Sequence, residues 1–118
     1  MAFTTKQIAR AIHLGEATIR QWLSRAPHFE IGTIVGAARL YTEKEAMTIM
    51  VASELMRHGL ARPYEALPAA RAAAHGRGVL WAYRDNNDEL AITPDRPAAA
   101  VAVMIPMDLL HSRLTNRK

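Results

Sequence analysis

The stretch from Thr4 to Arg25, TTKQIARAIHLGEATIRQWLSR, constrains the fold most, because it predicts two short helices joined by a tight turn. Thr4 is a favourable N-cap for the first helix, and Gln7 stands where a capping box has its second partner. The helical pattern breaks at His13–Glu16. We expect Gly15 to adopt the positive φ angle that a sharp interhelical turn requires.

The second helix begins near Glu16 or Ala17 and ends before Pro27, which cannot continue it. Its apolar face consists of Ile19, Trp22 and Leu23, and its polar face of Thr18, Arg20, Gln21 and Arg25. Two short helices around such a turn, with a polar outer face on the second, are typical of a helix-turn-helix. An ordinary pair of antiparallel helices with a solvated polar face fits this segment equally well.

A β-hairpin and a longer, capped helix follow. The strand-forming pieces His28–Ile31 and Ala38–Tyr41 flank a short loop bounded by glycines. Thr42 and Glu45 form a second capping box, which opens a helix predicted over residues 43–58. The apolar surface of this helix is broader than a single stripe, so we expect other elements to cover it on more than one side.

A further helix is predicted over Ala61–Ala74, after Gly59 has ended the preceding one. Pro63 is tolerated because it lies in the first turn. Pro68 is less favourable, and we expect it either to kink the helix or to move its start towards Leu67.

The C-terminal third changes from helical to strand periodicity. The predicted strands are Val79–Tyr83, Glu89–Ile92 and Ala99–Ile105. Asp85–Asp88 forms the turn between the first two, and Pro106 opens a final helix. The residues of that helix expected to face inward are Leu109, Leu110 and Leu114. This β-β-β-α unit is too small to be stable alone, so it must pack on the N-terminal helices or on a second copy.

Trp81 and Tyr83 lie two positions apart in the first of these strands, so they share one face of the sheet. We expect them to form a core and not a ligand pocket, with a dimer interface as its possible location. Together the patterns predict an α+β fold, mainly α. A DNA-binding unit would span residues 1–75, and a small strand-rich unit for dimerisation would span residues 78–118.

Composition limits the classes of function. The 118 residues carry a net charge of +4 and no cysteine, with a sequence pI of 10.0. A basic balance favours polyanionic partners such as nucleic acid, and the lack of cysteine fits a reducing cytosol. The five histidines are scattered, without carboxylate partners at metal-ligand spacing, and no nucleophile or phosphate-loop motif is present. We therefore expect no enzyme activity, no cofactor, no metal and no membrane association.

Four fragments in order give residues 3 to about 73 a resemblance to a known family. They are Thr5–Arg10 (TKQIAR), Ala17–Trp22 (ATIRQW), Arg39–Glu45 (RLYTEKE) and Met56–Leu60 (MRHGL). The chain resembles the winged helix-turn-helix DNA-binding domain of MerR-type regulators. The fragments look like the family's first helix, its recognition helix, the end of its wing and the break between its next two helices.

The resemblance implies a recognition helix at residues 17–25 that lies in the major groove. It places Thr18, Arg20 and Gln21 at bases or phosphates, and it makes Trp22 the buried anchor of the two-helix unit. Gln21 stands where the family usually has an aromatic residue, so a potential base reader replaces a phosphate contact.

The resemblance also implies a wing at residues 29–41 on the DNA backbone. Arg39 would contact phosphates from the wing, and Tyr41 would brace the wing against the core. We expect Arg25 and Lys6 to be further phosphate contacts. The family's long dimerising coiled coil has no counterpart here, so its dimer geometry is not carried over.

We expect a sequence-specific transcriptional regulator of bacterial or phage type, located in the cytoplasm with the nucleoid. Its partners would be double-stranded DNA, a second copy bound through the C-terminal unit, and RNA polymerase or another regulator. The predicted DNA-binding residues are Thr18, Arg20, Gln21, Arg25, Arg39, Lys6 and Tyr41. Two alternatives stay open: an architectural protein of excisionase or packaging type, and a protein-protein adaptor whose helix-turn-helix no longer binds DNA.

Overall fold

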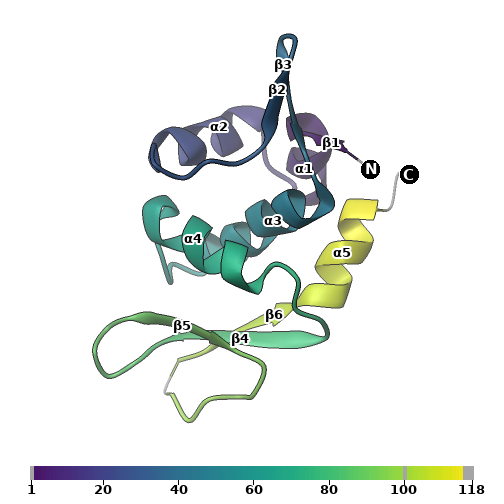
Figure 1. Cartoon of the computed structure of the whole chain (residues 1–118). Helices are drawn as coiled ribbons and strands as arrows, with labels where there is room; N and C mark the ends of the chain where they lie inside the picture. The colour runs from purple at the N-terminus through teal and green to yellow at the C-terminus, as the bar shows by residue number, and fades with distance from the viewer. Residues whose placement is uncertain (1, 100, 116–118) are drawn as a thin grey trace.

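The computed structural model describes residues 2–99 and 101–115, so residues 1, 100 and 116–118 of the two predicted units lie outside it. Within the described residues the chain forms five helices and two three-stranded antiparallel sheets (Figure 1). The elements are β1 (Phe3–Thr4), α1 (Thr5–Ala11), α2 (Glu16–Ser24), β2 (Thr33–Val35), β3 (Ala38–Tyr41), α3 (Glu43–Arg57), α4 (Pro63–Ala73), β4 (Val79–Arg84), β5 (Leu90–Thr93), β6 (Val103–Pro106) and α5 (Met107–Thr115). This is an α+β fold, and the predicted C-terminal β-β-β-α unit is confirmed.

β3 is the central strand of the first sheet, with β1 and β2 on its two sides. Phe3 pairs with Tyr41 and Thr4 pairs with Leu40, so the N-terminus is joined to the base of the β2–β3 hairpin. The predicted capping box of α1 is confirmed, since the side chain of Thr4 accepts from the N–H of Gln7. The sequence does not predict β1, because two residues carry no alternating pattern.

The predicted strand at residues 28–31 is wrong, because the partner of β3 is Thr33–Val35. The earlier segment packs against the body of the protein. The guanidinium of Arg71 on α4 stacks over the ring of Phe29 at 3.9 Å from its centroid. Ile31 is buried in the core, and the pairing with β3 begins after it, at Thr33.

α3 is the central helix of the fold, and nine of its 15 residues are buried. The prediction that it is covered on more than one side is confirmed. Its capping box is present: Thr42 Oγ1 accepts from the N–H of Glu45 at 3.1 Å, and the Glu45 carboxylate accepts from the N–H of Thr42 at 2.9 Å. Gly59 follows the C-cap residue His58 and has the expected positive φ, 70°.

α4 begins at Pro63, so the alternative that its start moves to Leu67 is wrong. Pro68 lies inside the helix and lacks the N–H that would bond to the carbonyl of Tyr64. Both residues are exposed, so water can satisfy that carbonyl. The helix therefore tolerates the proline on its solvent side.

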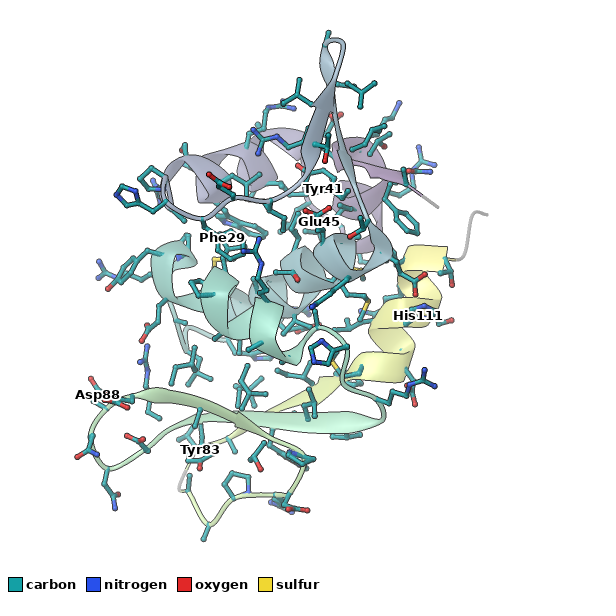
Figure 2. All side chains as sticks on the ribbon, in the orientation of Figure 1. Phe29, Tyr41, Glu45, Tyr83, Asp88 and His111 are labelled. Carbon is teal, nitrogen blue, oxygen red and sulfur yellow. The ribbon has the colours of Figure 1, made fainter. Side chains whose placement is uncertain are left out.

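β4 is the central strand of the second sheet, between β5 and β6. Leu80 and Ala82 are buried, whereas Trp81 and Tyr83 alternate with them and are only partly buried. Figure 2 shows Tyr83 on the side of the sheet away from α4. The expectation that the two aromatic residues form a core is therefore wrong for the single chain, because the strand's alternation turns the smaller residues inward.

The third strand starts later than predicted, at Val103 and not at residue 99. β5 and β6 lie on opposite sides of β4, so the residues between them form the connection that crosses the sheet. In α5 the prediction for Leu109 is wrong, since this side chain is 48% exposed. Met107 is buried in its place, and the other two predicted leucines are buried as expected, because they share one face of the helix.

The C-terminal unit shares one continuous core with the N-terminal helices, and α5 packs against both α1 and α3. A polar clamp reinforces this contact. Arg84 on β4 donates two hydrogen bonds to the carboxylate of Glu65 on α4, and others to the carbonyls of Leu60 and Asp88. The hydrogen bonds from Arg84 hold the pKa of Glu65 below its ordinary value, even though burial opposes this.

We predict that Glu65→Gln lowers the melting temperature at neutral pH by a few degrees at most, because Arg84 loses its anionic partner but the pair is partly exposed to water. A lowered pKa in the folded state stabilises the fold above the ordinary glutamate value of 4.5. This contribution disappears as the pH falls through the lowered value. The melting temperatures of wild type and variant should therefore converge on acidification, as followed by circular dichroism.

Glu89→Gln is the matched control, since Glu89 is exposed in the β4–β5 turn. It should leave the melting temperature nearly unchanged at neutral pH. Equal effects of the two substitutions would show that the clamp contributes nothing specific.

Candidate nucleic-acid interface

The turn between α1 and α2 places the positive φ on His13 (59°), whereas Gly15 has a φ of −82°. The prediction for Gly15 is therefore wrong. The N–H of Leu14 donates to the carbonyl of Ala9 at 3.0 Å, and the N–H of His13 donates to the carbonyl of Arg10 at 3.2 Å. These two bonds form a Schellman motif, which needs the left-handed conformation one residue after the helix cap. Gly15 instead is the N-cap of α2.

Ile19 is the fully buried residue of α2, and Trp22 is only partly buried. The implied role of Trp22 as the buried anchor is therefore wrong. α2 is nine residues long, and Ile19 is its one fully buried residue. The larger indole of Trp22 lies beside the contact with the core, where only part of its surface is covered.

The outer face of α2 carries Arg20, Gln21 and Arg25, all exposed, and Thr18, which is partly buried. Thr18, Arg20 and Gln21 line one surface hollow of the helix. A guanidinium nitrogen of Arg20 lies 3.6 Å from the carboxylate of Glu16 one turn earlier. Such a surface pair contributes at most about 1 kcal/mol, so it does not prevent Arg20 from binding another anion.

The β2–β3 hairpin stands clear of the rest of the molecule, beside α2 (Figure 1). Gly36, with a φ of 64°, makes its turn. Every residue of β2 is exposed, including Ile34 and Val35. The sequence reasoning missed these two because it assigned the strand to residues 28–31. The available signal was the run of uncharged residues around Gly36.

The base of the hairpin is fixed by Tyr41, which is 1% exposed. Its hydroxyl forms a hydrogen bond with Thr5 Oγ1 on α1 at 3.2 Å. Figure 2 shows Tyr41 and Glu45 together beneath the hairpin. Tyr41 therefore holds the hairpin against α1 and offers almost no surface of its own to a partner.

Glu45 links the hairpin to α3. One oxygen of its carboxylate accepts from the N–H of Thr42 at 2.9 Å, and the other accepts from the N–H of Gly32 at 2.7 Å. Burial alone would raise the pKa of Glu45, but the hydrogen bonds from Thr42 and Gly32, with the charge of Arg71, hold it below its ordinary value. One carboxylate thus caps α3 and positions the start of β2.

Arg39 leaves the hairpin on the side that faces α2. Its guanidinium donates to the carbonyl of Ile31 at 3.3 Å. Its side-chain stem lies against Gly32, where a Cβ atom would come within 2.8 Å of the Arg39 Cγ. The glycine, with a φ of 77°, therefore leaves room for Arg39 to lie along the hairpin base.

A groove of about 700 Å³ separates α2 from the hairpin. Arg20 and Ser24 line it from α2, and Ile34 and Arg39 line it from the hairpin. Tyr41 also lines it, at the hairpin base. The groove thus has one guanidinium on each side. Glu30 also lines it, so the three charged residues of the lining leave a net positive charge, which suits an anion.

The remaining predicted site residues lie elsewhere on the surface. Lys6 is exposed on α1, and Arg25 is exposed at the C-terminal end of α2. Neither lines the groove or the hollow on α2. The structure thus brings Arg20 and Arg39 together, and Thr18 and Gln21 next to them, but not the other two.

Among residues 2–99 and 101–115 no group of three or more His, Cys, Asp or Glu side chains is placed to hold a metal ion. No helix in that part of the chain is long and apolar enough to cross a membrane.

Comparison of the sequence with protein-family models and with curated proteins found no match. The resemblance to MerR-type domains therefore rests on the four sequence fragments and stays a prediction.

We predict that Gly32→Ala destabilises the protein more than Gly36→Ala, although both glycines have a positive φ. Gly36→Ala should cost about 1–2 kcal/mol for the left-handed conformation alone, because open space surrounds its Cβ. At Gly32 the added Cβ would also lie 2.8 Å from the Arg39 Cγ and 3.0 Å from the Tyr41 Cε1. Urea unfolding measures both variants, and equal losses would contradict close packing at the hairpin base.

Proposed function

We propose that the chain is a winged helix-turn-helix DNA-binding protein of transcriptional control, with α2 as its recognition helix and the β2–β3 hairpin as its wing. The observation that carries the proposal is the groove between these two elements, lined by Arg20 from one and Arg39 from the other. An exposed polar helix face adjoins it. The resemblance to MerR-type domains and the net charge of +4 support the same conclusion.

The dimensions of the two elements fit a duplex. A helix with its side chains is about 10–12 Å across, and the major groove is about 12 Å wide. When α2 lies in the major groove, a hairpin beside it reaches the edge of the neighbouring minor groove. One phosphate strand separates the two DNA grooves, so it runs along the groove between α2 and the wing. Arg20 and Arg39 then contact that strand from its two sides.

Gln21 is the residue to which we assign base reading. It is exposed on the outer face of α2, and its amide can pair with adenine through two hydrogen bonds. Thr18 beside it can contact a base edge or a phosphate. Arg20 has two choices, guanine or phosphate, and binding releases it from Glu16 at little cost, because that pair is on the surface.

A second copy supplies the affinity that one short recognition helix lacks. The contact proposed is the C-terminal unit, and its α5 side suits the purpose better than its sheet. In Figure 1 the outer face of the β4–β5–β6 sheet lies at the opposite end of the molecule from α2 and the wing. A two-fold contact through that sheet face would direct the two recognition helices away from each other. A contact along α5 keeps both on one side of the dimer.

An architectural role is the second candidate function, and a specific observation favours it. The end of the wing, residues 33–38, carries no charge. A wing that only contacts the DNA backbone is expected to carry Lys or Arg at its end, because cations bind the phosphates. An apolar end is better suited to a protein that deforms DNA.

The test begins with selection of binding sites from random DNA. Gln21→Ala should relax the preference at one or two positions, with a loss of about 1–3 kcal/mol of discrimination there. Arg39→Ala should weaken binding to all sequences alike and reduce the dependence of log Kd on log salt by about one unit. Arg96→Ala in the connection between β5 and β6 is the matched control, since this exposed arginine lies outside α2, the hairpin and α5, and it should preserve the selected sequence.

The proposal is wrong if the wild-type protein retards no duplex at low salt, the result that a protein-protein adaptor gives. Unchanged binding by both variants would show instead that another surface contacts DNA.

A further inference from the structure

β5 is an edge strand of the second sheet, and only one of its sides is paired. The strand order is β5–β4–β6, and four consecutive residue pairs join β5 to β4 without a bulge. A free edge presents N–H and C=O groups that can pair with another strand, and proteins often protect it with charged residues, prolines or bulges. Leu90–Thr93 contains none of these. At the opposite edge, β6 ends in Pro106 and leads directly into α5.

The pairing with β4 determines which backbone groups of β5 face outward. At the turn that precedes the strand, the N–H of Asp85 donates to the carbonyl of Glu89 at 2.9 Å. Bonded and non-bonded pairs alternate along an antiparallel ladder, so Ala91 bonds to β4, whereas the N–H and C=O groups of Leu90 and Ile92 point away from it. Within the described part of the chain no hydrogen bond reaches these outward groups.

A hollow of about 360 Å³ lies beside this edge, between β5 and α4. Three alanines of α4 line it, together with Leu90 and Ile92 of β5. Its one titratable residue is His75, which is exposed. A strand added to the edge would place every second side chain on the α4 side of the sheet, against this hollow. The added strand therefore needs apolar residues at alternate positions.

We propose that β5 pairs with β5 of a second copy of the chain, antiparallel and centred on Ala91, so that the two sheets join into one of six strands. In this register Leu90 of each copy lies opposite Ile92 of the other. Each such pair exchanges two hydrogen bonds through the groups that β4 leaves free. Residues directly opposite share a face, so both apolar side chains lie on the α4 side, beside the hollow. β5 thus supplies the residues that its own hollow requires.

The backbone excludes the neighbouring registers. A shift by one residue would oppose side chains of different faces, which a regular antiparallel pair does not allow. A shift by two residues would bring Asp88 or Pro94 into the pairing. The N–H of Asp88 is already bonded within its own turn, and its carbonyl accepts from Arg84. Pro94 has no N–H. The register centred on Ala91 therefore uses the free groups best.

The symmetry of the pairing keeps the helices of both copies on one side of the joined sheet. Because opposite residues share a face, α4 of each copy covers the same face. In Figure 1 α2 and the wing lie beyond α4 as seen from the sheet, so both recognition helices also lie on that side. The two copies of α4 come above neighbouring strands, and small exposed residues such as Ala72 permit this approach.

Charge does not oppose this contact. Glu89 comes opposite Thr93, and the acidic β4–β5 turn of one copy lies near the β5–β6 connection of the other, where Asp95 and Arg96 have opposite charges. The contact is smaller than the standard interface of about 20–30 residues a side, so we expect weak association. β5 and β6 are opposite edges, so α5 stays free for the contact proposed above.

The test is disulfide formation by full-length variants with one cysteine each, since the chain has no cysteine of its own. In the proposed register the two copies of Ala91 form a non-hydrogen-bonded pair with Cα atoms about 4.5 Å apart, within the range of a disulfide. Ala91→Cys should therefore form a linked dimer under mild oxidation without DNA, as followed on a non-reducing gel.

Thr93→Cys is the matched control, because it lies on the same face of the same strand as Ala91. Its two copies would be about 14 Å apart along the strands, too far for a disulfide. Ala91→Cys should form the linked dimer at least about tenfold faster than Thr93→Cys. Circular dichroism of both reduced variants should match that of the wild type.

Hydrogen exchange of the linked Ala91→Cys dimer then tests the strand pairing itself. The amides of Leu90 and Ile92 should exchange at least about tenfold more slowly in the linked dimer than in the reduced protein. Equal rates of disulfide formation by the two variants would overturn the proposal. A linked dimer in which these two amides exchange as fast as in the reduced protein would overturn it as well. Neither measurement includes DNA, so the proposed function is tested separately.

Discussion

The two hydrogen bonds that the Glu45 carboxylate accepts are the interaction on which the geometry of the proposed interface depends. The carboxylate accepts from Thr42, which starts α3, and from Gly32, which precedes β2. The β2–β3 hairpin, the proposed wing, is therefore attached to the most deeply buried helix of the fold. Tyr41 adds the second attachment, through its hydrogen bond with Thr5 on α1. The turn at His13 joins α2 to α1, and α1 packs on α3. Both sides of the groove are therefore attached to the same core.

That core includes elements beyond the two-helix unit and the hairpin. α4 and α5 pack on α3, and the Arg84–Glu65 clamp ties the second sheet to α4. α4 also acts on the interface itself, because Arg71 stacks on Phe29 and donates to the carbonyl of Glu30. These contacts hold the connection between α2 and the wing. The C-terminal unit is thus part of the support of the proposed interface.

Local chemistry made much of the fold predictable from sequence. The capping residues Thr4 and Thr42 marked two helix starts correctly, because a cap is made by residues close together in the chain. Tertiary contacts decided the failures. The strand expected at residues 28–31 has suitable side chains, but Phe29 packs under Arg71 instead. The pairing with β3 therefore begins at Thr33. The left-handed residue is His13 and not Gly15, because the end of α1 fixes the position that needs it.

The candidate site was also predictable from the sequence only in part. Helical periodicity alone identified the exposed arc of α2 that includes Arg20 and Gln21, since it depends on one element. The groove could not be derived from periodicity, because it forms between residues of two elements, and Arg39 was assigned only through a resemblance. The exposure of Ile34 and Val35 followed from a strand register that the sequence did not specify.

The most direct test of the central claim is a titration of the isotope-labelled protein with a selected duplex, followed by the amide resonances in two-dimensional NMR. If α2 and the wing form the interface, the largest shifts fall on the amides of Thr18–Gln21 and Thr33–Arg39. The amides of the β4–β5–β6 sheet then stay near their free positions. Shifts concentrated in that sheet, with α2 and the wing unchanged, would contradict the account.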